Sequence, residues 1–325
     1  MQTTIGTDIN TAIELLRSGE VVAIPTETVY GLAANGLNEN SVLRIFEIKN
    51  RPRFNPLILH VSSLKQLKKY VTAVPTAAMV LADTFSPGPI TFLLDKQEIV
   101  PDLVTAGSSK VAIRIPSHPL ALDILSRIDF PLAAPSANLF GYVSPVTAAH
   151  VFQGLQGLIP YILDGGECSV GLESTICGFE EDAVVIHRLG GISPEDIASA
   201  TGLPVHFQLT HQKPDTPGQL KSHYAPHKPL WVGDVDSLMQ VHKGNKIAVI
   251  SFRKKYVYPE PAVQYNLSPD GDLHEAARNL FTALRQLDEL DVEIILAERF
   301  PESGLGRAIN DRLQRAQFVN KVDEI

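Results

Sequence analysis

Short apolar runs alternate with amphipathic stretches along most of this chain, and this alternation limits the possible folds more than any other feature. One amphipathic stretch follows Thr7-Asp8, a good helix start, and ends at Gly19. Because short strands that alternate with helices build a layered α/β fold, the first two thirds of the chain are predicted to be an α/β domain. The runs that predict its strands are residues 21–24, 56–61, 90–94, 111–115, 131–134 and 184–188.

The pattern changes between residues 206 and 229, where prolines and polar residues exclude both a helix and a central strand. We therefore predict three parts: a domain over residues 1–205, a linker over 206–229 and a smaller domain over 230–325. The last part has predicted strands at 230–232, 246–251, 263–267 and 292–297, and helices over 273–290 and near Leu305. This order favours a small Rossmann-like layer. It lacks a Gly-x-Gly-x-x-Gly turn, so its fold alone indicates no nucleotide.

Composition narrows the class of protein. A length of 325 residues with 44% hydrophobic residues is enough for two buried cores. The formal net charge of -8 disfavours non-specific binding to nucleic acid. The two cysteines, Cys168 and Cys177, form no Cys-x-x-Cys pair and are interpreted as reduced thiols. Residues 1–6 do not resemble a signal peptide, and no apolar run approaches the roughly 20 residues of a membrane span, so we expect a cytoplasmic protein.

A basic segment stands just before the second predicted strand. Lys49, Arg51 and Arg53 place three cations within five positions, and Pro52 and Pro56 keep the segment out of regular structure. Arginine can hold phosphate oxygens through two parallel hydrogen bonds, and lysine adds a point charge. The segment therefore indicates an anion site, although charge alone leaves a solvated basic loop as the alternative.

Three clusters of small polar residues, at 25–31, 134–138 and 171–176, are interpreted as following apolar strands. Open α/β sheets place ligands there, and hydroxyl and amide side chains suit carboxylate, amine and phosphate groups. Taken singly, each cluster is more typical of an ordinary turn than of a ligand site. His223 and His227 are spaced like metal ligands on a helix, but Pro226 excludes that helix, so a zinc site is disfavoured. The sequence contains no phosphate loop and no nucleophile elbow.

Lys49-x-Arg51 followed by Ser136-x-Asn138 resembles the YrdC family of threonylcarbamoyl-AMP synthases. Segments 25–32, 85–91 and 171–176 are similar to other motifs of that family, in the same order, and 217–226 and 304–313 resemble segments of its longer, two-domain members. One departure is Leu189, which follows Arg188 where the family usually has a proline that would restrict the local backbone.

The resemblance implies a twisted, mostly parallel sheet with helices, concave on the ligand side, and a smaller Rossmann-like domain. It implies a nucleotidyltransferase, an L-threonylcarbamoyladenylate synthase, that forms threonylcarbamoyl-AMP and pyrophosphate from ATP, L-threonine and bicarbonate. Mg²⁺ would accompany the ATP, and no protein side chain is assigned to a metal. The product would pass to a transferase that modifies the adenosine next to the anticodon of tRNA. A weak contact with RNA is compatible with this, and no membrane is involved.

The resemblance also assigns residues. The predicted catalytic residues are Lys49 and Arg51, which would neutralise charge on the leaving pyrophosphate. Threonine would be surrounded by Thr28, His60, Arg114 and Ser174. ATP would be held by Arg51, Asn55, Ser136, Asn138, Ser144, Arg188 and Tyr224, with the linker acting as a lid. Three alternatives of the same fold stay open: an RNA-binding module, a carbamoyltransferase and an inactive homologue. The zinc-finger and acylphosphatase segments that a carbamoyltransferase would carry are not visible.

Overall fold

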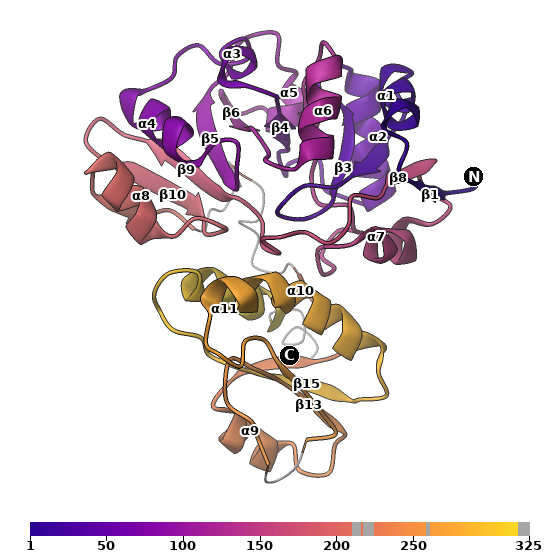
Figure 1. Cartoon of the computed structure of the whole chain (residues 1–325), viewed down its shortest axis with the longest axis vertical. Helices are drawn as coiled ribbons and strands as arrows, with labels where there is room; N and C mark the ends of the chain where they lie inside the picture. The colour runs from indigo at the N-terminus through magenta and orange to yellow at the C-terminus, as the bar shows by residue number, and fades with distance from the viewer. Residues whose placement is uncertain (210–215, 217–223, 258–260, 318–325) are drawn as a thin grey trace. The chain divides into compact units, whose positions relative to one another are not determined.

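The computed structural model describes residues 1–209, 216, 224–257 and 261–317 (Figure 1). The chain separates into two compact units: unit 1 comprises Met1–Phe140 and Ser144–Leu220, and unit 2 comprises Gly141–Val143 and Lys221–Ile325. The sheet of unit 1 extends through residue 207, two residues into the predicted linker. Linker residues 210–215 and 217–223 lie outside the described residues. Within the described ranges, no helix combines the length and the apolar character needed to cross a membrane.

Unit 1 contains one large sheet and the helices packed on it. Its helices are α1 Ile9–Arg17, α2 Glu39–Lys49, α3 Leu64–Leu67, α4 Thr76–Phe85, α5 Asp102–Thr105, α6 Pro119–Arg127, α7 Ala148–Leu155 and α8 Pro194–Thr201. Its strands are β1 Thr4–Gly6, β2 Val22–Ile24, β3 Gly31–Asn35, β4 Ile58–His60, β5 Ile90–Asp95, β6 Lys110–Arg114, β7 Leu132–Ala133, β8 Tyr161–Leu163, β9 Thr175–Phe179, β10 Val184–Arg188 and β11 Val205–Phe207. Every strand predicted for this unit is confirmed.

The strands of unit 1 follow the order β1-β8-β2-β3-β7-β4-β6-β5-β9-β10-β11. Parallel pairs join β1 to β8, β2 to β8, β4 to β6, β5 to β9 and β10 to β11. Antiparallel pairs join β2 to β3, β3 to β7, β4 to β7, β5 to β6 and β9 to β10. The α/β class is confirmed, and the sheet is a more even mixture of the two pairings than the resemblance implied.

Helices α1 and α2 show how the local sequence sets the fold. Asp8 caps α1 by accepting the Asn10 backbone N–H at 3.0 Å, and the apolar side of α1 packs with α6 in one core cluster with β2 and β8. Helix α2 ends at Lys49 and is followed by the C-cap residue Asn50, whose backbone lies in the left-handed region (φ 51°). Asparagine tolerates this conformation, so the chain turns sharply between Lys49 and Arg51.

Unit 2 is a smaller layer built from β12 Leu230–Gly233, α9 Val235–Val241, β13 Ile247–Ser251, β14 Val263–Asn266, α10 Leu273–Glu289, β15 Ile294–Glu298 and α11 Gly306–Gln317. Its four strands are all parallel, in the order β12-β15-β13-β14. The apolar stripe of α10, which includes Leu280, Phe281 and Leu284, is fully buried. The predicted Rossmann-like layer is thereby confirmed.

Gly190 packs closely against the backbone of residues 173–175, which leads into β9. A Cβ atom there would lie 2.2 Å from the Glu173 carbonyl oxygen and 2.5 Å from the Thr175 backbone nitrogen. The adjacent Gly191 N–H donates to the same Glu173 carbonyl at 3.0 Å. Only glycine allows this close approach of the two chain segments.

We therefore predict that Gly190→Ala lowers the free energy of unfolding by about 1–3 kcal/mol, because the backbone of residues 173–175 must move. Urea unfolding measures the change. Gly154→Ala, at a position in α7 where an added Cβ meets nothing within 4 Å, is the control and is expected to be neutral or slightly stabilising. Equal stability of the two variants would contradict this account.

Candidate active site

A row of cross-strand neighbours in the sheet of unit 1 contains several of the predicted site residues. Strand register pairs His60 with Arg114, Arg114 with Thr91, Thr91 with Ile176, and Ile176 with Arg188. Residues directly opposite each other on neighbouring strands lie on the same face of a sheet. The row therefore brings the predicted threonine residues His60 and Arg114 and the predicted nucleotide residue Arg188 to one face.

Below the row, the same face is apolar. Ile58, Ala112 and Leu93 each stand two positions from a member of the row, and together with Ile176 they form a buried cluster. Because side chains two positions apart on a strand lie on the same face, the polar groups of the row lie next to this buried apolar cluster.

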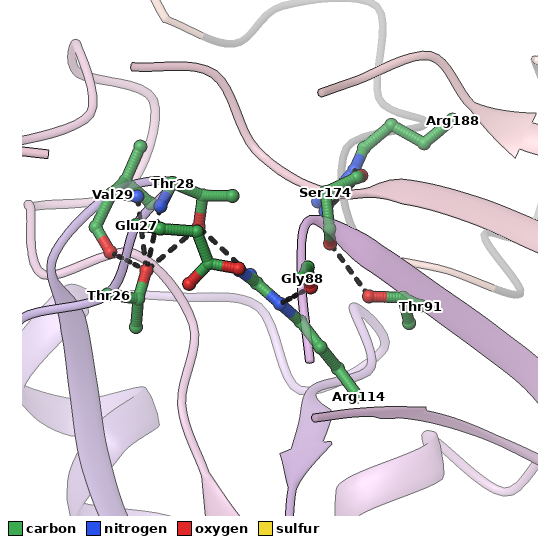
Figure 2. A network of polar contacts seen from close by, with 9 residues as sticks. All are labelled: Thr26, Glu27, Thr28, Val29, Gly88, Thr91, Arg114, Ser174 and Arg188. Atoms are coloured by element: carbon green, nitrogen blue, oxygen red, sulfur yellow. Dashed lines mark hydrogen bonds and ion pairs between the residues drawn. The ribbon is translucent and has the colours of Figure 1, made fainter. Parts of the chain in front are cut away.

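Arg114 is buried at the centre of a polar network (Figure 2). Its Nε donates to the Gly88 carbonyl at 3.2 Å, one terminal nitrogen donates to Thr28 Oγ1 at 2.9 Å, and the other pairs with Glu27 Oε1 at 2.5 Å. Burial of Glu27 opposes ionisation, but the charge of Arg114 and its hydrogen bond outweigh this and hold the pKa of the carboxyl below its usual value. Glu27 is therefore an anion that neutralises the buried guanidinium.

The loop between β2 and β3 delivers Glu27 and Thr28 to Arg114. Thr26 stiffens this loop: its hydroxyl donates to the Val29 carbonyl at 2.6 Å, and the Thr28 hydroxyl lies 2.8 Å away and can donate to it. The consecutive residues Thr26, Glu27 and Thr28 thus form a turn that is held by its own hydrogen bonds. Glu27 and Thr28 contact Arg114 at the end of β6.

Ser174, the residue before β9, contacts two members of the row, Thr91 and Arg188. Its hydroxyl oxygen lies 2.7 Å from Thr91 Oγ1 and accepts a hydrogen bond from Arg188 at 3.0 Å. Arg188 also donates to the Ser174 carbonyl at 2.9 and 3.1 Å. The predicted threonine residue Ser174 and the predicted nucleotide residue Arg188 are therefore in direct contact, as Figure 2 shows.

His60 is buried and neutral. Burial, assisted by the nearby charge of Arg114, lowers its pKa to about 3. Nδ1 lies 3.2 Å from the Ile58 carbonyl, and the backbone of Leu132 also interacts with the ring. As a neutral imidazole, His60 carries one donor and one acceptor nitrogen.

Lys49, at the end of α2, is buried against the segment that follows β7. Its Nζ donates to the Ser136 carbonyl at 2.6 Å and to the Asn138 carbonyl at 2.5 Å. Burial, with a further contribution from Arg51, lowers the pKa of the ammonium well below its usual value. The two predicted motifs, Lys49-x-Arg51 and Ser136-x-Asn138, are thus physically joined through the lysine.

Arg51 organises the basic segment itself. Its Nε donates to the Asn55 carbonyl at 3.1 Å, and a terminal nitrogen donates to Asn55 Oδ1 at 2.7 Å and to the Pro56 carbonyl at 2.8 Å. Arg51 and Asn55 are both buried, whereas Arg53 between them is exposed. The solvated-loop interpretation of this segment therefore applies to Arg53 only.

The remaining predicted residues lie in two places. Ser144 donates to Glu173 Oε1 at 2.6 Å, next to Ser174 in sequence. Tyr224 belongs to unit 2, where its ring stacks on Phe281 with 5.6 Å between centroids and the Arg312 guanidinium lies 5.0 Å from its centroid. Its role toward a nucleotide stays a prediction.

Sequence reasoning passed over Glu27, Thr91 and Glu173 as individual residues, although all three lie in segments that it singled out. The cluster at 171–176 was expected after a strand, but Glu173 and Ser174 precede β9. In the part of the chain that the structure describes, no three His, Cys, Asp or Glu side chains gather into a metal-binding set.

Comparisons with known proteins identify the family of this chain. The family model described as "Telomere recombination" matches residues 14–190, and the model "Threonylcarbamoyl-AMP synthase, C-terminal domain" matches residues 192–317. A threonylcarbamoyl-AMP synthase of Pyrococcus abyssi is 41% identical over 324 residues, covering 95% of this chain and 93% of that protein. One of Bacillus subtilis is 41% identical over 318 residues, covering 94% of this chain and 91% of that protein.

Among solved structures, the crystal structure of P. abyssi Sua5 complexed with L-threonine matches with a TM-score of 0.89 at 38% identity. The match covers 98% of this chain and 97% of that one. Because both family models and these relatives together span nearly the whole chain, the resemblance seen in the sequence is confirmed. The chain belongs to the threonylcarbamoyl-AMP synthase family, in the form that carries both domains.

Proposed function

We propose that this chain is an L-threonylcarbamoyladenylate synthase, which forms threonylcarbamoyl-AMP and pyrophosphate from ATP, L-threonine and bicarbonate. The observation that supports it best is the row from His60 to Arg188, which places residues predicted for threonine and residues predicted for the nucleotide on one face of the sheet. In this reaction an oxygen of N-carboxy-threonine attacks the α-phosphorus of ATP and pyrophosphate leaves. No protein nucleophile takes part.

The amino-acid site is proposed around Arg114. In its bonds to the described residues, Arg114 uses one N–H on each of its three nitrogens, so one N–H on each terminal nitrogen remains. A carboxylate is the natural partner for that pair of donors. Neutral His60 offers an acceptor for a hydroxyl or amine hydrogen, and Thr28 and Ser174 supply hydroxyls. The chemistry of this set suits the zwitterion of threonine.

The nucleotide site is proposed around Lys49, Arg51, Asn55, Ser136, Asn138, Ser144 and Arg188. The role of Tyr224 toward the nucleotide rests on the sequence resemblance alone. Two buried cations on either side of Asn50 provide positive potential in a medium of low dielectric constant, where it acts strongly on phosphate charge. In this structure the ammonium of Lys49 also holds the segment that carries Ser136 and Asn138 in place. Catalysis would then consist of positioning and of neutralising the leaving pyrophosphate.

Mg²⁺ is part of the proposal as an ion carried by the triphosphate. When bound, it would withdraw charge from the phosphate oxygens. The acidic residues next to the row are Glu27 and Glu173, and each already has a partner, Arg114 and Ser144 respectively. The proposal therefore assigns the ion no protein ligand.

Two further elements of the proposal concern the cell. The product is a mixed anhydride that water destroys, so we propose transfer to a partner enzyme in the cytoplasm that modifies tRNA beside the anticodon, with at most a weak contact between this chain and RNA. Relatives that match nearly the whole chain carry the synthase name, which favours this activity over the RNA-binding and carbamoyltransferase alternatives.

The reaction is tested by measuring pyrophosphate release with ATP, L-threonine and bicarbonate, each omitted in turn. Because the proposed nucleophile forms from threonine and bicarbonate, release is expected only with all three present. Release that continues without threonine or without bicarbonate would rule the reaction out. ATP-independent transfer from carbamoyl phosphate would support the carbamoyltransferase alternative.

We predict that Arg51→Ala and Lys49→Met each lower the rate of pyrophosphate release by about 10²-fold, because a cation near the leaving group is lost. Arg53→Ala is the matched control: it removes the exposed cation of the same segment and is expected to retain the wild-type rate. Thermal unfolding of each variant accompanies the assay. Folded Arg51→Ala and Lys49→Met proteins with wild-type rates would remove the anion site from this segment.

The neutral state of His60 predicts a pH dependence of stability. Its pKa is about 3 in the folded chain and about 6.5 when unfolded, so between these values only the unfolded state binds the proton. The free energy of unfolding should therefore fall as the pH drops from 6.5 toward 3.

We predict that His60→Gln makes that fall shallower, as measured by urea unfolding at pH 7 and pH 5. His274→Gln, which replaces an exposed histidine of α10, is the matched substitution control. An unchanged slope in His60→Gln would mean that His60 is charged in the folded protein.

A further inference from the structure

We infer that Thr91 is a positioning residue of the amino-acid site: its hydroxyl donates to Ser174 Oγ and thereby directs the Ser174 hydrogen to the carboxylate of the substrate. This inference rests on the proposed function. It adds a residue that was not among the predicted site residues and that acts through Ser174 rather than by touching the substrate.

Thr91 lies at the middle of the cross-strand row. It faces Arg114 on β6 and Ile176 on β9, and both its side chain and that of Ser174 are completely buried. Figure 2 shows its hydroxyl pointing at Ser174, on the side away from Glu27 and Thr28. Thr91 therefore stands opposite Arg114 in the row while its hydroxyl contacts Ser174, which in turn contacts Arg188.

The count of hydrogens determines the direction of the bonds. Arg188 can only donate, so Ser174 Oγ accepts its N–H at 3.0 Å. Thr91 and Ser174 together carry two hydroxyl hydrogens, and the 2.7 Å contact between them uses one. With a carboxylate beside Ser174, both hydrogens are used only if Thr91 donates to Ser174 and Ser174 donates to the carboxylate.

The opposite direction leaves a donor without a partner. If Ser174 donated to Thr91, the Thr91 hydrogen would need a second acceptor, and in the part of the chain that the structure describes its hydroxyl contacts only Ser174. A completely buried hydroxyl hydrogen without an acceptor is unfavourable. A bound carboxylate therefore selects the arrangement in which Thr91 donates.

The side chain of threonine suits this role. Its branched Cβ restricts χ1, and its place on a central strand restricts it further, so the hydroxyl points in one direction. Valine has nearly the same shape and lacks the hydroxyl, whereas serine keeps the hydroxyl and loses only the methyl group. These two replacements separate the hydrogen bond from the packing.

The test measures the KM for L-threonine in pyrophosphate release and the Kd for L-threonine by calorimetry. Thr91→Val is expected to raise both constants by about 10-fold, the effect of losing one buried hydrogen bond, while kcat at saturating threonine stays within about 2-fold. Thr91→Ser is expected to stay within about 3-fold of the wild type. Should Thr91→Val not fold, Thr91→Ala removes the hydroxyl without adding bulk and takes its place.

Two controls make the result specific. Thr3→Val removes another buried hydroxyl, which donates to the Ile159 carbonyl at 2.6 Å beside the edge strand β1, and it should leave both constants unchanged. In a Ser174→Ala background, Thr91→Val should have no further effect on threonine binding, because Thr91 acts through Ser174. An undiminished effect in that background would overturn the inference.

Failure of the inference differs from failure of the proposed function. If the wild-type protein releases pyrophosphate only with threonine and Thr91→Val has an unchanged KM and Kd, the role of Thr91 is wrong and the function stands. A Thr91→Val protein that is only less stable, with unchanged threonine affinity, leads to the same conclusion. If the wild-type protein neither binds threonine nor depends on it, the proposed function fails, and this inference fails with it.

Discussion

The buried guanidinium of Arg114 is the constraint on which the rest of the site depends. A charge inside a protein is costly unless it is paired and fully hydrogen-bonded. Arg114 stands at the end of a central strand, next to the buried cluster of Ile58, Leu93, Ala112 and Ile176. Glu27 supplies the opposite charge, and Thr28 and Gly88 accept two further bonds. This requirement holds the loop after β2 against the sheet and so assembles one half of the site. The other half includes Arg188, which donates hydrogen bonds to the carbonyl and hydroxyl oxygens of Ser174.

Much of the fold follows from the sequence because its signals are local. The helix start at Asp8, the buried runs of β5 and β10 and the apolar stripe of α10 each appear within a short window, and each is confirmed. The strands that escaped prediction are β1, β3, β8, β9 and β11. They are short, and several begin in segments rich in glycine and small polar residues that are equally typical of turns. Their strand conformation comes from pairing with neighbours, which a local pattern does not contain.

The site was less accessible to sequence reasoning, for a related reason. The rule that ligands lie at the carboxyl ends of strands assumes parallel neighbours, whereas β5 and β6 are antiparallel. Thr91, near the start of β5, therefore stands beside Arg114 at the end of β6, and only the register reveals this. Lys49-x-Arg51 and Ser136-x-Asn138 were visible as motifs. That Lys49 binds the carbonyls of the second motif could not be read from either one.

The cross-strand row also determines where the chain can change in length. Insertion of one residue within β5 or β6 would turn every following side chain of that strand to the opposite face and carry Thr91 or Arg114 away from its partners. Extra residues in a connection that holds none of these partners would leave the register intact, unlike the connection between α4 and β5, where Gly88 accepts a hydrogen bond from Arg114. Natural variation in length and the grafting of foreign segments should therefore be tolerated in such connections and excluded from these strands.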